Sequence, residues 1–335
     1  MATPQGSTCR IESRDRTTVV ELGLDSRAVS ISYSDPALPG TMSFQTAITD
    51  TDWAALKQAA FAPSGPTDER RLRLEQFAER ARLPARATAR RLVEAARWLL
   101  TSGEKTNHTY LLGDLCKVYL AHTVAAATGV SAAAAAGYIA EAENDAALAN
   151  HVRVTRAAQP ADLRATSDAE VRFGRRLGWY AVVRALKPRL VVETGVDKGL
   201  GGVLLCAALL RNAGEGHAGR YIGTDINPRA GYLLSGAYQD VGGVVYGDSL
   251  TSLAALKGEV GVFINDSDHN PDYEAQEYAA ITPRLAKGAV ILSDNAHATG
   301  VLADFAAARG QRFLFWREQP AGHWYPGAGI GFAFD

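Results

Sequence analysis

The segment 189–225 constrains the fold of this chain more than any other part of the sequence. In order, it has the patterns of a strand, a glycine-bearing turn, a helix and a second strand, at 190–193, 195–202, 203–210 and 221–224. Glycines let the backbone of such a turn approach a ligand, and the N-terminus of the helix offers free N–H groups. Asp225 ends the second strand, where an acid can accept both hydroxyls of a ribose. The segment therefore predicts a βαβ unit that binds a nucleotide-like ligand.

The same alternation continues to the C-terminus. Strand-like runs end in or beside acidic residues, namely Glu193, Asp225, Asp248, Asp266 and Asp294. Predicted helices lie between most of them, at 199–213, 228–238, 271–286 and 298–309. The last two strands, 312–317 and 329–334, are joined by a short link that favours an antiparallel hairpin. Alternating strands and helices predict an α/β fold with a seven-stranded, doubly wound, mostly parallel sheet, of Rossmann-like type.

The N-terminal half has a different pattern. Period-two alternation predicts a small β meander with strands at 17–24, 28–33 and 41–48. Helices are expected at 49–60, at 68–81, from Pro84 to Gly103, and across 109–149, where Gly113, Gly129 and Gly137 would break the last one. A capping box at 167–170 (SDAE) predicts a further helix that ends near Pro188. We therefore expect two domains, an N-terminal helical and β region at 1–165 and a ligand-binding domain at 166–335.

The polar link 104–108 (EKTNH) permits two interpretations. Lys105, Asn107, His108 and Tyr110 either line a substrate pocket or form the solvated start of a helix. The second interpretation is the more common one for such a sequence.

Composition excludes several classes of protein. The 335 residues carry 35 basic and 36 acidic side chains, for a net charge of −1, which argues against a dedicated nucleic-acid-binding protein. The three cysteines are far apart and indicate neither a disulfide framework nor a cysteine-based zinc site. The sequence has no signal-peptide pattern at 1–16 and no apolar run long enough to cross a membrane. We expect a soluble, cytoplasmic protein that does not bind membranes.

The acids at the strand ends indicate where the chemistry lies. Ligands of an open parallel sheet bind outside the carboxyl ends of its strands. A carboxylate at a buried strand end is costly unless something binds it. Helix capping can account for one such acid, but five in succession indicate a binding site.

The turn 193–199 (ETGVDKG), Asp225 and the tripeptide 247–249 (GDS) together resemble class I S-adenosylmethionine-dependent methyltransferases, over about 173–335. The resemblance implies that the turn holds the methionine part of the cofactor, Asp225 the ribose hydroxyls and Asp248 the adenine amino group. Asp197 departs from the family, which often has glycine there. The cofactor-binding residues implied in this way are Glu193, Thr194, Gly195, Gly199, Asp225, Ile226, Asp248, Ser249 and Asp266. The glycine spacing does not match the G-x-G-x-x-G fingerprint of dinucleotide-dependent dehydrogenases.

A second group of polar residues ends the fourth and fifth strands, at 265–269 (NDSDH) and 293–295 (SDN). It is similar to the metal site of catechol-type, caffeoyl-CoA-type and macrocin-type O-methyltransferases, with Asp266 and Asp294 separated by 28 residues. The resemblance implies a Mg²⁺ ion held by oxygen ligands, with Asp266 preferred over Asp268. The implied ligands are Asp266, Asp268, Asp294 and Asn295. The alternative is that these residues only cap the helices that follow.

The catalytic base has two candidates. His269 stands at the position where the catechol type has a lysine base, and His297 follows Asn295 by two residues. An imidazole titrates near neutrality and can accept a hydroxyl proton. Asp266, as a metal ligand, completes the implied catalytic set.

The resemblance implies methyl transfer from S-adenosylmethionine to a hydroxyl of a small molecule, in secondary metabolism, with a bound metal lowering the pKa of that hydroxyl. The residues leave three alternatives open: N-methylation or C-methylation without a metal, and a catalytically silent cofactor-binding partner protein. We expect residues 1–165 to form a lid, substrate or dimer contact, and the protein to be a homodimer.

Overall fold

The computed structural model describes residues 3–5, 8–12, 18–23, 28–34, 41–47, 67–106 and 108–335. The chain divides into two compact units, Met1–Thr101 and Ser102–Asp335. The second unit begins before the boundary predicted at 165, because the helices between 114 and 164 pack against helices and strands of the sheet domain. All candidate site residues belong to the second unit.

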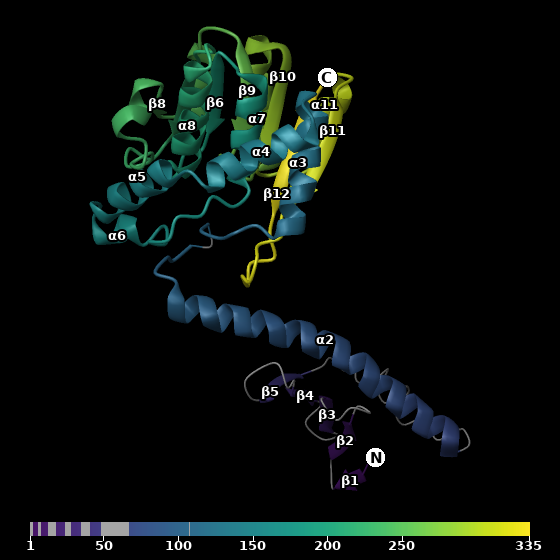
Figure 1. The fold of residues 1–335 in the computed structure, drawn as a ribbon. Coiled ribbons are helices and arrows are strands. Elements are labelled where there is room, and N and C mark those ends of the chain that lie inside the picture. Colours follow the sequence, from purple (N-terminus) through teal and green to yellow (C-terminus); the bar gives the residue numbers. More distant parts are fainter. Residues whose placement is uncertain are drawn as a thin grey trace. The chain divides into compact units, whose positions relative to one another are not determined.

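The first unit contains a five-stranded antiparallel sheet and one long helix (Figure 1). Its strands, in their order across the sheet, are β1 (Thr3–Gln5), β2 (Thr8–Glu12), β3 (Thr18–Gly23), β4 (Ala28–Ser34) and β5 (Thr41–Ala47). The predicted meander is confirmed, with two further strands before it. Helix α2 (Thr67–Thr101) contacts β2, β3 and β4. It runs through Pro84, so the two predicted helices are one. The predicted helix 49–60 lies outside the described residues.

The second unit is built around a seven-stranded sheet, which confirms the predicted fold class. Its strands are β6 (Leu190–Thr194), β7 (Arg220–Asp225), β8 (Gly242–Tyr246), β9 (Val260–Asn265), β10 (Leu285–Ser293), β11 (Arg312–Arg317) and β12 (Gly329–Phe334). They lie in the order β11-β12-β10-β9-β6-β7-β8, and only β12 runs antiparallel to its neighbours. The chain reverses its strand order beside β6, where β7 lies on one side and β9 on the other. An open sheet binds its ligand at such a switch point.

Helix α7 (Arg176–Leu186) precedes the first of these strands, and α8 (Leu200–Gly214), α9 (Ser249–Ala255), α10 (Pro271–Ile281) and α11 (Val301–Ala308) lie between later ones. One predicted helix is wrong: the segment 228–238 forms turns followed by the short 3-10 helix η1 (Gly236–Asp240). The helix predicted to end near Pro188 is α7, but it begins at Arg176 and not at the capping box 167–170. There Asp168 accepts hydrogen bonds from the Ser102 hydroxyl (2.8 Å) and the Gly103 amide (2.6 Å).

The predicted long helix at 109–149 is three helices followed by a single turn. They are α3 (Asp114–Thr128), α4 (Ala132–Glu143), α5 (Ala146–Ala157) and α6 (Ala161–Arg164). Gly129 ends α3 in the left-handed conformation (φ 77°), as predicted, whereas Gly137 lies within α4. Among the described residues no single helix is long and apolar enough to cross a membrane, although α3 and α4, bent by 119°, meet these limits as a pair.

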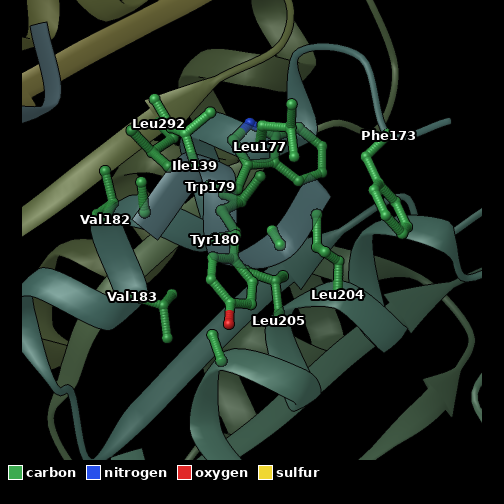
Figure 2. Close-up of a cluster of buried hydrophobic side chains, with 14 of the residues drawn as sticks. Ile139, Phe173, Leu177, Trp179, Tyr180, Val182, Val183, Leu204, Leu205 and Leu292 are labelled. Carbon is green, nitrogen blue, oxygen red and sulfur yellow. The ribbon is translucent and has the colours of Figure 1, made fainter. Parts of the chain in front are cut away.

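Helix α7 lies in the centre of the main core (Figure 2). Trp179, Tyr180, Val182 and Val183 are fully buried, among side chains from α4, α8 and the sheet. Burial of one large apolar side chain stabilises the fold by about 1.5–3 kcal/mol. The position of α7 against the sheet is therefore firmly fixed.

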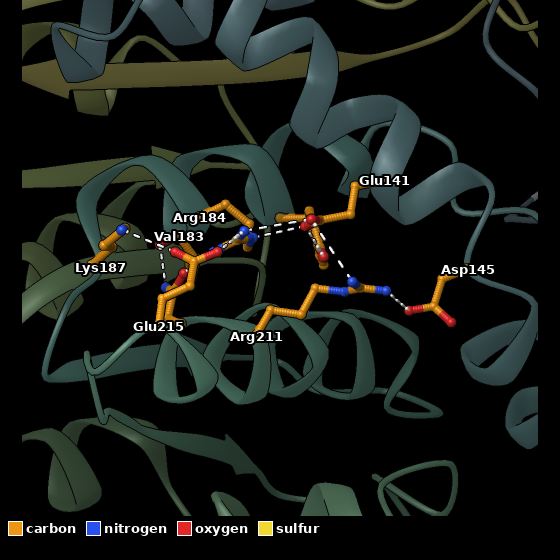
Figure 3. Close-up of polar contacts among 9 residues, drawn as sticks. Glu141, Asp145, Val183, Arg184, Lys187, Arg211 and Glu215 are labelled. Atoms are coloured by element: carbon orange, nitrogen blue, oxygen red, sulfur yellow. Dashed lines mark hydrogen bonds and ion pairs between the residues drawn. The ribbon is translucent and has the colours of Figure 1, made fainter.

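A polar network holds the same helix from its C-terminal end (Figure 3). The buried Arg184 guanidinium donates to Glu141 of α4 (2.7 Å) and to Glu215 beyond α8 (2.6 Å). Arg211 of α8 donates to Asp145, the N-cap of α5 (2.7 Å). These contacts join α4, α5 and α8 to α7, and thereby fix the N-terminus of α7 at the sheet's carboxyl edge.

Candidate active site at the carboxyl ends of the strands

A cavity of about 760 Å³ lies where β6, β7, β8, β9 and β10 end. The loops after these strands line it, together with the N-terminal end of α7, His108 and Tyr325. Ten of the residues singled out by sequence lie in its wall: Gly195, Asp225, Ile226, Asp248, Ser249, Asp266, Asp268, His269, Asp294 and His297. The fold therefore brings most of the predicted site together.

The glycine turn after β6 is held close to the loop after β9. Gly195 has φ 81°, and a Cβ at this position would lie 2.0 Å from the Asp266 carbonyl oxygen, so no larger residue fits. Gly199 (φ 89°) is the N-cap of α8, touches Gly231 and does not line the cavity.

Asp197 occupies the left-handed region, with φ 49°. Aspartate tolerates this conformation better than most residues other than glycine. Its amide donates to Asp225 (2.9 Å), and its carboxylate accepts from the buried Lys198 ammonium (2.8 Å).

Asp225 and Ile226 form one end of the cavity. The two carboxylate oxygens of Asp225 accept from the backbone amides of Asp197 (2.9 Å) and Asn227 (2.8 Å), which fixes the side chain. A carboxylate has about four lone-pair sites, so two remain for ligand hydroxyls. Ile226 is 82% exposed although it is a large apolar residue, and it offers the cavity a flat apolar surface.

Asp248 lies at the same end and caps a helix as well. Its side chain accepts from the Thr251 amide (2.8 Å) at the start of α9 and from the Tyr273 hydroxyl (2.9 Å). The hydrogen bond from the Thr251 amide lowers the pKa of Asp248. Ser249 bonds to the same Tyr273 hydroxyl (2.7 Å). Tyr273 was not predicted, since one tyrosine in an amphipathic helix carries no distinctive signal.

Glu193 and Thr194 lie outside the cavity wall. Glu193 is 1% exposed and accepts from the Tyr221 hydroxyl at 2.5 Å. It lies beneath the first turn of α8, where a Cβ at Gly201 would come within 2.5 Å of its carboxylate. Burial raises the pKa of Glu193 to about 8. Thr194 is also buried and donates to Glu277 (3.1 Å). Because strand side chains alternate in direction, an acid at a strand end can face the core, and that is the position of Glu193.

The predicted metal ligands are arranged around an arginine. Arg175, just before α7, donates from Nε and Nη2 to the two carboxylate oxygens of the buried Asp294. This ion pair holds the pKa of Asp294 at about 2, although burial alone would raise it. Burial and the neighbouring Asp294 raise the pKa of Asp266 well above its usual range.

The remaining predicted ligands do not complete a metal site. Asp268 is exposed and accepts from the Asn270 amide (3.2 Å). Asn295 lies behind the wall, and its Nδ2 donates to Asn265 (3.3 Å) and to the Asp268 carbonyl (3.1 Å). Within the described part of the chain, no group of three or more His, Cys, Asp or Glu side chains is placed to hold a metal. With Asp294 already paired to a guanidinium, these residues do not fit a divalent cation.

Arg175 belongs to a larger buried network. Its Nη1 donates to the Tyr110 hydroxyl (3.0 Å) and to Glu318 (3.3 Å), while Tyr110 donates to Glu318 (2.5 Å). Of the polar link 104–108, His108 lines the cavity and Lys105 is exposed. Burial, followed by the charge of Lys198, lowers the pKa of His108 to about 3. The pocket interpretation is therefore right for His108, whereas Asn107 lies outside the described residues.

The two candidate bases face the same cavity, with ring centroids 6.1 Å apart. His297 Nδ1 lies 3.0 Å from the Asp294 carbonyl oxygen. A carbonyl can only accept, so the proton of the neutral ring is on Nδ1 and Nε2 is a free acceptor. For His269 the structure shows no comparable orienting hydrogen bond among the residues it describes.

Part of the chain is similar to known proteins. Residues 192–296 match the family model described as a methyltransferase domain. Similar solved structures include the SAH-bound methyltransferase PaMTH1 of Podospora anserina (18% identity, 58% of this chain and 92% of that one, TM-score 0.40). Others are the O-methyltransferase TomG of Streptomyces achromogenes with SAM (16%, 57% and 90%, 0.39) and an O-methyltransferase of Bacillus cereus with SAH (16%, 57% and 92%, 0.39).

No curated protein matches the chain. The family match spans β6 to the end of β10, including every strand end around the cavity. Residues 192–296 are therefore similar to a methyltransferase domain, on a sheet with the strand order of the class I, S-adenosylmethionine-dependent fold.

Proposed function

We propose that this enzyme transfers a methyl group from S-adenosylmethionine to a hydroxyl of a small molecule. One observation carries the proposal: a single cavity is lined both by Asp225 and Ile226 and by His269 and His297. Asp225 would take the ribose hydroxyls and Ile226 the adenine face, with Asp248 near its amino group. When bound, the cofactor supplies an electrophilic methyl group. Calorimetry with S-adenosylhomocysteine tests this assignment, and a wild-type protein that does not bind it would refute the proposal.

His297 is the better candidate for the base. Its Nδ1 is tied to the Asp294 carbonyl, so Nε2 can accept the acceptor's hydroxyl proton without a change of tautomer. Removing a general base typically lowers kcat by about 10²–10⁴-fold. We expect H297A to show such a loss and H269A a much smaller one. The reverse order would assign the base to His269.

We propose that the reaction proceeds without a metal ion. The buried Arg175 already supplies the positive charge beside Asp294 and Asp266, and a cation there would compete with it. Turnover should therefore be the same after treatment with EDTA and after addition of Mg²⁺. Loss of turnover in EDTA that Mg²⁺ restores would support the metal-assisted alternative, in which the Arg175–Asp294 pair opens.

The acceptor is proposed to be a small molecule of secondary metabolism, since the cavity is lined by strand-end loops and the chain carries no net positive charge that would favour nucleic acid. We also propose a cytoplasmic homodimer. Light scattering coupled to size exclusion tests the dimer, and a monomer at micromolar concentration would contradict it.

A further inference from the structure

Arg176, the first residue of α7, is a buried cation without a hydrogen-bond acceptor. It is 5% exposed and lines the strand-end cavity. Among the residues that the structure describes, none accepts a hydrogen bond from its guanidinium, and its Nη1 is fully buried. The guanidinium carbon lies over the Trp179 ring, 5.5 Å from the centroid. A guanidinium has five donors, so this side chain is far from satisfied.

The acidic groups around Arg176 are Asp294, Asp197, Glu193 and Asp266, and in the described part of the chain none of them accepts a hydrogen bond from it. Asp294 pairs with Arg175, and Asp197 with Lys198. Glu193 accepts from Tyr221 beneath the turn. An unpaired buried charge is unfavourable, whereas the same charge with a bound acceptor is strongly stabilising. The missing partner is therefore expected on a ligand.

We propose that Arg176 binds a carboxylate of a ligand in this cavity. Guanidinium and carboxylate match as planar groups joined by two parallel hydrogen bonds. A singly charged anion suits this wall, because Asp225, Asp248 and Asp268 would repel a phosphate more strongly. The inference rests on the proposed function, which leaves two sources: the methionyl carboxylate of the cofactor, or a carboxylate on the acceptor.

The test compares ligands with and without the carboxylate. R176M keeps an unbranched apolar side chain against Trp179 but removes the charge. S-adenosylhomocysteine carries the methionyl carboxylate, while 5′-methylthioadenosine has the same nucleoside and thioether without it. If the cofactor is the source, R176M weakens S-adenosylhomocysteine about 10- to 100-fold by calorimetry and leaves 5′-methylthioadenosine unchanged.

The second arm uses 3,4-dihydroxybenzoate and catechol as probes of the acceptor side, titrated with and without saturating S-adenosylhomocysteine. If the acceptor is the source, the wild-type protein prefers the benzoate and R176M loses this preference, while S-adenosylhomocysteine affinity is unchanged. R176K, which keeps the charge without the planar fork, should lie between R176M and the wild type in the arm that responds.

Two controls separate a binding role from a structural one. Arg172 pairs with Glu170 outside this cavity, so R172M should change neither arm. The thermal midpoint of ligand-free R176M should equal or exceed that of the wild type, because an unpaired buried charge has been removed. The proposal is overturned if R176M binds all four probes like the wild type. It is also overturned if R176M loses affinity for S-adenosylhomocysteine and for 5′-methylthioadenosine by the same factor. A wild-type protein that fails to bind S-adenosylhomocysteine refutes the proposed function instead, and the benzoate arm then decides the role of Arg176.

Discussion

Glu193 ends the strand on which the cofactor site is built, and its burial makes the stability of the protein depend on pH. Its pKa is about 8 in the fold, against an ordinary value of 4.5. Between these two pH values the folded protein holds a proton that the unfolded chain has lost, so stability falls as pH rises, by about 1.4 kcal/mol per pH unit. This loss begins above pH 4.5 and is complete just above pH 8.

The substitution E193Q replaces the carboxyl group by a neutral amide of the same shape, which can still accept from Tyr221. Its free energy of unfolding should match that of the wild type near pH 5 and exceed it by about 4 kcal/mol at pH 8. Urea unfolding at pH 5, 6, 7 and 8 measures this difference. E259Q, at an exposed glutamate, is the matched control and should show no such trend.

A stability difference between E193Q and wild type that is constant from pH 5 to pH 8 would refute this reasoning. The same variant tests the placement of the side chain outside the cavity. S-adenosylhomocysteine affinity at pH 6 should be unchanged, since the side chain faces Tyr221 and not the ligand. A tenfold loss of affinity would instead show that the Glu193 side chain is part of the cofactor site.

Three further changes test the site. R175M leaves Asp294 buried and unpaired, so the free energy of unfolding measured in urea should fall by about 3–5 kcal/mol. Much of this stability should be recovered in R175M/D294N. A loss below about 1 kcal/mol in R175M would contradict the importance of this pair. D225A should weaken S-adenosylhomocysteine about 10- to 100-fold by calorimetry, and unchanged affinity would remove Asp225 from the site. D197G relieves the strain of the left-handed backbone at residue 197 but leaves the Lys198 ammonium unpaired. It should therefore destabilise the fold by roughly 1–3 kcal/mol. A variant more stable than the wild type would show that the backbone strain outweighs the ion pair.

The local patterns predicted the sheet domain well and the helices less well. Each of the strands β6 to β12 coincides with a short apolar run in the sequence. The acids at the ends of the parallel strands locate the cavity, because the carboxyl ends of parallel strands share one edge of the sheet. The helix predicted from the capping box at 167–170 begins only at Arg176, because Asp168 bonds to Ser102 and Gly103, which are distant in sequence. The helix predicted at 228–238 failed because packing of Gly231 against Gly199 overrides its propensity.

Sequence alone could not show whether the predicted metal ligands bind a metal ion. The spacing of Asp266 and Asp294 matches a metal-dependent family, but spacing does not show which cation fills the space between two carboxylates. Arg175 lies 119 residues before Asp294 and reaches it only because α7 packs against α3, α4 and α8. No local pattern in the segment RFGRR distinguishes it from a solvated helix start.

Sequence alone therefore determined the βαβ unit, the seven-stranded order of elements and the row of acids at the strand ends. These follow from local periodicity and from the direction of parallel strands, which nearby residues encode. Tertiary structure alone decided which acids face the cavity, as Asp225 does and Glu193 does not. It also placed Arg175 and Arg176 in the same cavity wall as Asp266 and Asp294, because burial and ion pairing depend on residues that only the packing of α7 brings together.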